Sequence, residues 1–455
     1  MKLYNTLSRK VEEFTPINDK KVNFFVCGPT VYDLSHLGHA KTYIQMDILA
    51  RTLRALDYKV FYLQNITDID DKIIARADEK GESWKELSQE FETKYFEDMQ
   101  SLNVTSVTKY AKATDYIDDI IRQVQTLIDK GHAYIIEDGI YFEIKTFPGY
   151  GKLSGRTEVK KDDAQTRIDH SDEKRGWNDF CVWKFSKPNE PVWDAPFGKG
   201  RPGWHIEDTA ITEHFFGPQY DIHGGAVDLI FPHHEAEITQ MEAISGKVPF
   251  VRYWTHVGFL NINSAKMAKS TGNFFTIRDV LAKGYDPMAI RLLMLQSHYR
   301  SAVNFSWDEL DAAQNRLKTY QAMADQQWQT SPNNFVNSKL TATTKEAIST
   351  SLSNDLETPG ALAHLSQFEN AVSEHGIPED TKTAFLEFLT WLDSIFGLQL
   401  ANRQAISDTQ KQMITEREQA RQSKDFTKAD ELRKQLEEQG IEVRDTPHGP
   451  IWFRM

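Results

Sequence analysis

Apolar residues near the amino terminus form two short continuous runs separated by a stretch with helical spacing. The run Lys21–Val26 predicts a buried strand, residues 38–56 predict a helix, and residues 59–63 predict a second strand. A strand, helix, strand unit implies parallel strands in an α/β sheet, whose ligand site lies at the carboxyl ends of the strands. Cys27 and Thr67 fall at such ends.

The pattern farther along the chain predicts a change of architecture. Helices are predicted over 71–79, 83–101 and 114–130, a hairpin at Asp138-Gly139 within 133–144, and a strand at 220–223 with a helix after Pro232. Residues 145–203 are rich in Lys, Asp, Gly and Pro and have weak periodicity, so we expect an insertion that carries loops. The chain then reads as helical from Ile277 to about Leu398, with a polar link at 327–345. A long charged helix after Gln404 precedes a small α/β tail.

Length and composition narrow the class of protein. A chain of 455 residues is too long for one core, so we expect roughly three or four domains. No run of about 18 apolar residues appears, and the amino terminus lacks the apolar stretch and cleavage site of an export signal, so we expect a cytosolic protein. The only cysteines, Cys27 and Cys181, lie far apart, which argues against a disulfide framework.

The formal net charge of -13 at first disfavours a nucleic-acid partner, because neutralising phosphates requires Lys and Arg. Net charge averages over all faces of a protein, however, and basic clusters occur at 156–161 and 417–428. Each cluster taken alone is also compatible with an ordinary solvated surface. Charge therefore leaves a nucleic-acid partner open.

Two short motifs carry candidate phosphate chemistry. His36-Leu37-Gly38-His39 opens a predicted helix, where free amides and the helix dipole attract anions and Gly38 permits close approach. Lys266 and Lys269 lie on a glycine-flanked loop that can close over phosphates and neutralise a leaving pyrophosphate. Simple helix capping and a plain surface loop are the alternatives. The two motifs together favour triphosphate binding more than either does alone.

At these residues the chain resembles the cysteinyl-tRNA synthetases, a class I family. Residues 26–33 (VCGPTVYD) with 36–39 resemble the opening signature of that family. Further blocks match in the same order at 67–72, 203–207, 223–225, 231–235 and 266–270. The resemblance covers essentially the whole chain, and it is specific because several long blocks agree.

The resemblance implies that ATP, used with Mg²⁺, activates cysteine to cysteinyl adenylate, and that cysteine then passes to the terminal adenosine of tRNA(Cys). The implied catalytic residues are His36, His39, Lys266 and Lys269, and the implied ATP-binding residues are Pro29, Thr30, His36, Gly38, His39 and Lys269. The implied cysteine-binding residues are Cys27, Thr67, Trp204 and Asp228. The implied anticodon contacts are Arg421, Phe426, Asp430, Asp445 and Trp452, with Phe426 where tryptophan is frequent. Taken as bare residues, Trp204 is compatible with a core position, Thr67 with a helix cap, and the charged tail residues with ordinary surface.

A zinc site is also expected. His233 and Glu237 lie four residues apart on one face of a helix that Pro232 can begin, so both can point at a common ion. By the same reasoning His234 and Glu235 should face elsewhere. A zinc protease signature would need histidine at position 238, which is isoleucine here.

Cys27 and Asp208 would complete four zinc ligands. The family commonly has cysteine at position 208, and aspartate is a harder ligand than thiolate, so this departure bears on zinc affinity. The alternative is that Asp208 caps a helix and that Cys27 is a small buried strand residue. Zinc would explain selectivity, because an apolar pocket separates cysteine from serine by only ~1–3 kcal/mol.

The sequence thus predicts a Rossmann-like nucleotide-binding catalytic domain with an insertion, then an α-helical bundle and a small C-terminal α/β module. The expected segments are 1–115 and 204–260 (catalytic halves), 116–203 (connective insertion), 261–310 (signature loop and stem contacts), 311–400 (helical tRNA-binding bundle) and 401–455 (anticodon-binding module). A monomer is expected from the family. Two other functions remain open: a ligase joining cysteine to a small amine, and a noncatalytic tRNA-binding paralogue.

Overall fold

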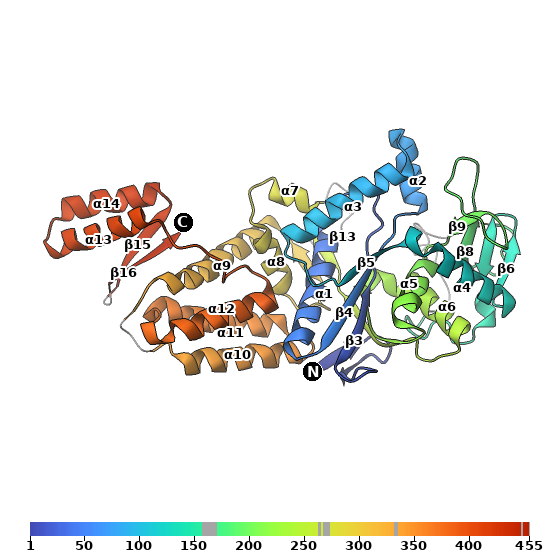
Figure 1. The fold of residues 1–455 in the computed structure, drawn as a ribbon, viewed down its shortest axis with the longest axis horizontal. Helices are drawn as coiled ribbons and strands as arrows, with labels where there is room; N and C mark the ends of the chain where they lie inside the picture. Colours follow the sequence, from blue (N-terminus) through green and yellow to red (C-terminus); the bar gives the residue numbers. More distant parts are fainter. Residues whose placement is uncertain (157–170, 263–264, 267–273, 332–334, 447–448, 455) are drawn as a thin grey trace. The chain divides into compact units, whose positions relative to one another are not determined.

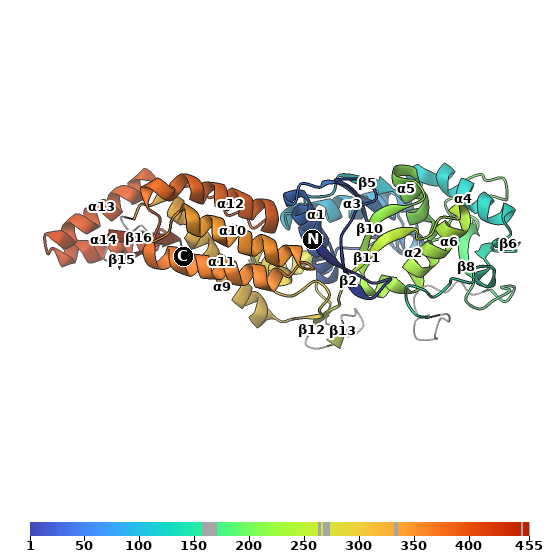
Figure 2. The same cartoon turned by 90° about the horizontal axis from the view of Figure 1, so that it is seen from below.

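In the computed structural model, a five-stranded parallel sheet organises the amino-terminal part of the chain (Figures 1 and 2). The structure describes residues 1–156, 171–262, 265–266, 274–331, 335–446 and 449–454. It divides into one unit of Met1–Lys283 with Tyr299–Asn304, and a second unit of Gly284–His298 with Phe305–Met455. No helix among the described residues is long and apolar enough to cross a lipid bilayer.

The strand order of the sheet, β11-β10-β3-β4-β5, places the candidate ligand site. Its strands are β3 (Lys21–Val26), β4 (Lys59–Ile66), β5 (Lys109–Lys112), β10 (Tyr220–Ala226) and β11 (Val251–Val257). Every pair in the sheet is parallel, which confirms the prediction. The chain builds outward from β3 through β4 and β5 on one side and later adds β10 and β11 on the other. The order therefore reverses between β3 and β10, and such a switch point is where open α/β sheets bind ligands.

Seven helices of the first unit are described. They are α1 (Leu37–Ala55), α2 (Asp71–Lys80), α3 (Trp84–Ser101), α4 (Ile117–Asp129), α5 (Ile206–Phe216), α6 (Glu235–Ser245) and α7 (Ile277–Leu281). α1 joins β3 to β4 as predicted, and it is buried on nearly all sides. Asp47 of α1 is fully buried, and its carboxylate is stabilised there by the ion pair with Arg51 and by the N–H groups of Thr105 and Ser106. α3 begins at a capping box between Ser83 and Glu86.

The insertion contains an antiparallel sheet of order β6-β7-β8-β9. Its strands are β6 (Ala133–Ile136), β7 (Gly139–Phe142), β8 (Phe180–Phe185) and β9 (Gly200–Pro202). The hairpin at Asp138-Gly139 is confirmed. The insertion also contains two strands that the sequence did not predict, β8 and β9. β8 (FCVWKF) is a short apolar run interrupted by Lys184 within a polar stretch, and β9 has only three residues.

Two smaller sheets complete the first unit. β1 (Lys2–Asn5) pairs with β2 (Lys10–Glu13), and a sheet of order β13-β12-β14 contains β12 (Leu260–Ile262), β13 (Ala265–Lys266) and β14 (Val303–Phe305).

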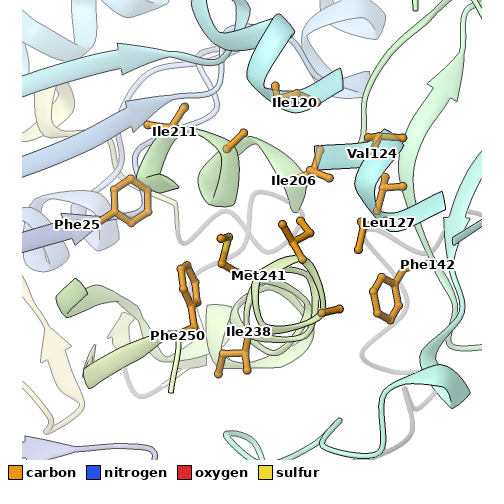
Figure 3. Packing of buried hydrophobic residues seen from close by; sticks show 14 of the residues in the cluster. Phe25, Ile120, Val124, Leu127, Phe142, Ile206, Ile211, Ile238, Met241 and Phe250 are labelled. Carbon is orange, nitrogen blue, oxygen red and sulfur yellow. The ribbon is translucent and has the colours of Figure 1, made fainter. Parts of the chain in front are cut away.

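One hydrophobic cluster joins the parallel sheet to the insertion (Figure 3). Phe25 of β3, Val124 of α4, Phe142 of β7 and Met241 of α6 all belong to it, and all are fully buried. Figure 3 shows the side chains of α4 and α6 directed into the same interior. The helix α6 that carries the candidate metal ligands is thereby packed from the side of the insertion as well as from the sheet.

The second unit is helical, as predicted. Its helices are α8 (Pro287–Leu295), α9 (Trp307–Asp325), α10 (Ser338–Ser353), α11 (Thr358–His375), α12 (Lys382–Phe396), α13 (Asp408–Gln422) and α14 (Phe426–Glu438). α10 packs against α11 and α12 (Figure 2). The predicted polar link at 327–345 is wrong from Ser338 onward, because the first two core-facing residues of α10 are Thr341 and Thr344 and give no hydrophobic signal.

The charged helix and small α/β tail that the sequence predicts are confirmed at the carboxyl end. After α13 and α14, β15 (Ile441–Thr446) pairs antiparallel with β16 (Gly449–Arg454). A small separate core includes Ile414, Leu436, Val443 and Trp452.

Gly28→Ala should destabilise the fold at the switch point. A Cβ at Gly28 would lie 1.7 Å from the Asn65 carbonyl oxygen, so the backbone after β3 would have to move away from β4. We expect a loss of about 1–3 kcal/mol in the free energy of unfolding, measured by urea denaturation. Gly360→Ala in α11 is the matched control, since the nearest atom there is 3.3 Å away, in the flexible Glu357 side chain. Equal stability of the two variants would contradict the prediction.

Candidate active site

The carboxyl ends of β3 and β10 bring a thiol and an imidazole together. Cys27 directly follows β3, and its backbone N–H donates to the Gly224 carbonyl of β10. Its Sγ lies 3.2 Å from His223 Nε2. Both side chains are buried at the strand-order reversal.

Two helices bring the other predicted ligands to this point. His233 lies in the short helical turn Ile230–His234 that leads into α6, and its Nε2 is 3.0 Å from Glu237 Oε1 of α6 and 3.0 Å from Asp208 Oδ2 in the first turn of α5. One ligand atom each from Cys27, Asp208, His233 and Glu237 lies within 4.8 Å of the other three. The four residues that the sequence proposed as ligands therefore share one buried place that could hold a metal ion.

His234 also reaches the cluster, contrary to the prediction that it faces elsewhere. Its Nε2 lies 3.1 Å from Cys27 Sγ, and Cys27, His223, His234 and Glu237 form a second group with metal-ligand spacing. The physical reason is that positions three and four residues before Glu237 both flank its face of the helix. Glu235 does face elsewhere, where it accepts backbone N–H groups of the insertion at Gly151, Leu153 and Ser154.

Burial makes negative charge expensive in this cluster. It raises the pKa of Cys27 and Glu237 well above their usual values, with further raising by neighbouring acids, and it raises the pKa of Asp208 to about 7. Burial lowers the pKa values of His223 and His234. The histidines are thus neutral, and a thiolate with two carboxylates needs a cation to offset its charge.

One carboxylate oxygen of the cluster fits the role of a cation ligand. Among the described residues, Glu237 Oε2 is buried with no hydrogen-bond partner, and His223 Nδ1 approaches it only to 3.5 Å. His223 Nδ1 instead lies 2.7 Å from the Tyr220 hydroxyl. Buried carboxylate oxygens are normally satisfied, so this orphan atom fits a ligand set for a cation.

The predicted cysteine-binding residues besides Cys27 differ in burial and in their contacts. The Trp204 ring stacks on the His233 imidazole, with centroids 4.1 Å apart. Thr67 is buried and donates to Glu207 Oε2 at 2.9 Å, while Asp70, not Thr67, caps α2. Asp228 is exposed in the turn after β10.

His36 and His39 cap α1 reciprocally. Nδ1 of each ring accepts the backbone N–H of the other residue, at 3.3 and 3.4 Å, and the rings stack with centroids 3.8 Å apart. An Nδ1 that accepts must be unprotonated, so each ring carries its proton on Nε2. Burial and the neighbouring His36 lower the pKa of His39. The capping alternative therefore describes a real contact.

The remaining predicted ATP-binding residues are partly described. Pro29 accepts the Thr67 N–H, Thr30 bridges to Thr67, and Gly38 lies in the first turn of α1. Lys266 belongs to β13 by its backbone, but its side chain and all of Lys269 lie outside the described residues.

The predicted anticodon residues lie in the carboxyl-terminal module. Asp445 binds Arg417 through both carboxylate oxygens and also pairs with Arg421. Phe426 is 62% exposed, whereas Trp452 is 5% exposed and packs in the module core. Asp430 is exposed on α14. Of the two aromatic rings, Phe426 has the open face.

Sequence reasoning assigned no role to His223, His234 or Glu207. Burial strongly raises the pKa of Glu207, which contacts Thr67 and directly precedes the candidate metal ligand Asp208 in the sequence. The helical spacing of three residues between His234 and Glu237 was the available signal for His234. His223 reaches the cluster because β10 pairs with β3, which no local pattern in the sequence indicates.

The chain matches two family models. Residues 13–315 match the class I (C) tRNA synthetase catalytic domain, and residues 403–452 match the cysteinyl-tRNA ligase anticodon binding domain. The cysteine–tRNA ligase of Thermoplasma acidophilum is 42% identical over 455 residues, which cover 100% of both chains. That of Legionella pneumophila is 42% identical over 464 residues, covering 100% of this chain and 99% of its own length.

Solved structures show the same fold at low identity. Mycobacterium tuberculosis methionyl-tRNA synthetase, in complex with methionyl-adenylate, has a TM-score of 0.61 at 13% identity and covers 84% of this chain and 92% of its own. LeuRS of Agrobacterium radiobacter K84, in a ternary complex with tRNA, has a TM-score of 0.60 at 10% identity and covers 87% of each chain. These likenesses support the architecture alone.

Proposed function

Because the chain belongs to the cysteinyl-tRNA synthetase family, we propose that its buried cluster around Cys27 selects the cysteine side chain through a zinc ion. The chain is a cysteine–tRNA ligase, and cysteine, ATP and tRNA(Cys) are its substrates. The observation that carries the zinc proposal is the convergence of four donor atoms within 4.8 Å at the end of β3. A cytosolic location and a monomeric state stay predictions.

The donor set suits zinc. Cys27, Asp208, His233 and Glu237 would supply one sulfur, one nitrogen and two carboxylate oxygens, all ligand types that zinc accepts. One thiolate and two carboxylates would exceed the charge of the ion by one, and His223 and His234 add no positive charge because burial lowers their pKa values. A zinc ion bound there would hold the substrate sulfur as a thiolate, a species that serine does not readily form.

The amino-terminal end of α1 is the proposed ATP contact. His36 and His39 would donate their Nε2–H groups to phosphate oxygens, because both Nδ1 atoms are already used in the reciprocal cap. Neutral donors suit this place, since burial lowers the pKa of His39. The positive end of the helix dipole would add to the attraction for phosphate.

The reaction would proceed mainly by positioning and electrostatics. The cysteine carboxylate attacks the α-phosphate of ATP in line, and pyrophosphate leaves as the adenylate forms. Lys266 and Lys269 would neutralise the charge that develops on the pyrophosphate. A ribose hydroxyl of the terminal adenosine of tRNA(Cys) then attacks the cysteinyl carbonyl, and AMP leaves.

The carboxyl-terminal module would read the anticodon. Its match to an anticodon binding domain supports tRNA, not a small amine, as the acceptor of cysteine. Phe426, exposed at the start of α14, would stack on an unpaired base, while Arg421 would reach base edges beside it. Asp445 would orient Arg421 through their ion pair.

Asp208→Ala should weaken zinc binding. The purified protein should hold about one zinc per chain, and loss of one ligand should lower zinc affinity by at least ~10-fold, measured by competition with a chelator. Glu207→Gln is the control, because Glu207 is an equally buried carboxylate that contacts Thr67. A zinc-free protein that binds no added zinc, or unchanged affinity in Asp208→Ala, would refute the proposal.

His36→Ser should separate capping from ATP binding. Serine is a good N-cap, so the free energy of unfolding should change by less than about 1 kcal/mol. Removal of the imidazole donor should slow ATP–pyrophosphate exchange by about 10²-fold. Exchange at the wild-type rate would mean that His36 serves only as a helix cap.

Phe426→Ala should weaken tRNA binding without affecting adenylate formation. Loss of one stacked base costs about 1–3 kcal/mol, so the KM for tRNA(Cys) should rise on the order of 10-fold. ATP–pyrophosphate exchange, assayed without tRNA, should stay unchanged. Leu386→Ala, at another exposed apolar residue, is the control. An unchanged KM for tRNA would exclude stacking by Phe426.

A further inference from the structure

Lys41 is a buried cation whose role the reaction described above does not include. It lies on α1 two residues after His39, and it is 1% exposed. Its Nζ donates to three backbone carbonyls, those of Gly258 at 2.6 Å, Phe259 at 3.0 Å and Ser301 at 2.7 Å. An ammonium group has three N–H donors, so the three carbonyls match the charged form in number.

Burial of the charged Lys41 side chain costs free energy. Burial lowers the pKa of Lys41 to about 7, and no acid among the described residues offsets that effect. Buried lysines usually pair with a carboxylate. Here the ammonium group instead donates hydrogen bonds to backbone carbonyls.

The three carbonyls belong to the base of the hairpin that leads to Lys266. Gly258 and Phe259 connect β11 to β12, and Ser301 precedes β14. Backbone bonds join the same two stretches, from Gly258 N–H to Tyr299 and from Val303 N–H to Phe259. β12 pairs antiparallel with β13, which ends at Lys266. Lys41 therefore links the base of this hairpin to α1.

The chain that follows the lysine motif returns to the same helix. The Leu37 N–H donates to the Phe275 carbonyl at 3.1 Å, and the Ile277 N–H donates to the Ser35 carbonyl at 3.0 Å. Between them, His36 bridges to Thr276. The first two turns of α1, which carry His36 and His39, thus hold the chain both before and after the lysine motif.

We propose that Lys41 is a positioning residue for adenylate formation, which sets the β12–β13 hairpin at a fixed place relative to His36 and His39. The proposal rests on the proposed roles of the two histidines and of Lys266 and Lys269 at the phosphates. Lys41 touches no reacting atom and acts through backbone carbonyls. Loss of its ammonium group removes the hydrogen bonds that tie the Gly258, Phe259 and Ser301 carbonyls to α1 and frees the hairpin to shift. Misplacement by about 1 Å can cost on the order of 10²-fold in rate.

Lys41→Met tests the proposal, because methionine keeps the length of the side chain without its donors. ATP–pyrophosphate exchange should lose ~100-fold in kcat, with the KM for cysteine and the zinc content unchanged. Transfer of cysteine from preformed adenylate to tRNA should keep its rate, since pyrophosphate has already left. A merely structural role would lower both steps together.

Lys130→Met is the matched control. Lys130 donates to the Ala243 and Ile244 carbonyls at the end of α6 and not to the β12–β13 hairpin, so its loss should leave exchange unchanged. Lys41→Arg, which keeps charge and donors, should restore most of the exchange rate and covers the case in which Lys41→Met does not fold. Normal exchange in Lys41→Met, equal loss in both half-reactions, or no recovery in a folded Lys41→Arg would overturn the proposal.

Lys269→Ala separates this proposal from the one it rests on. Unchanged exchange in Lys269→Ala would overturn the pyrophosphate role of the motif, and with it the need to position the hairpin. Slow exchange in Lys269→Ala with normal exchange in Lys41→Met would overturn only the positioning role of Lys41.

Discussion

The burial of acidic ligands at the point where the strand order reverses is the constraint on which the active site depends. Cys27, Asp208 and Glu237 are each almost or entirely inaccessible to solvent, and burial raises the pKa of all three. Such a group is tolerable only with compensating positive charge or with protons. A metal ion that supplies the charge also supplies a bond that distinguishes sulfur from oxygen, so one electrostatic requirement serves both the fold and specificity.

Helix α1 carries the candidate ATP-binding histidines of the site. Its amino terminus is built from two histidines that cap each other, and this fixes both rings as neutral Nε2–H donors. Its second turn holds the hairpin of the lysine motif through Lys41. The segments that would contact ATP therefore meet at one helix, although they are more than 200 residues apart in the chain.

The insertion shares its hydrophobic core with the parallel sheet, whereas the carboxyl-terminal module has a core of its own. Glu235 of α6 also accepts three backbone N–H groups of the insertion. The carboxyl-terminal module has a small core of its own, in which Trp452 is buried. Its exposed aromatic residue is Phe426, so burial within the module decides which ring is open to a base.

The sequence by itself determined the parallel sheet, the helical second half and the tail, because each has strong periodicity or continuous apolar runs. It also selected Cys27, Asp208, His233 and Glu237, since helical spacing and block order are local properties. It missed β8, a short apolar run that Lys184 interrupts within a polar stretch, β9, which has three residues, and the start of α10, where buried threonines give no hydrophobic signal. Only the tertiary structure placed His223, His234 and Lys41, because strand pairing and long-range packing determine which side chains and carbonyls meet.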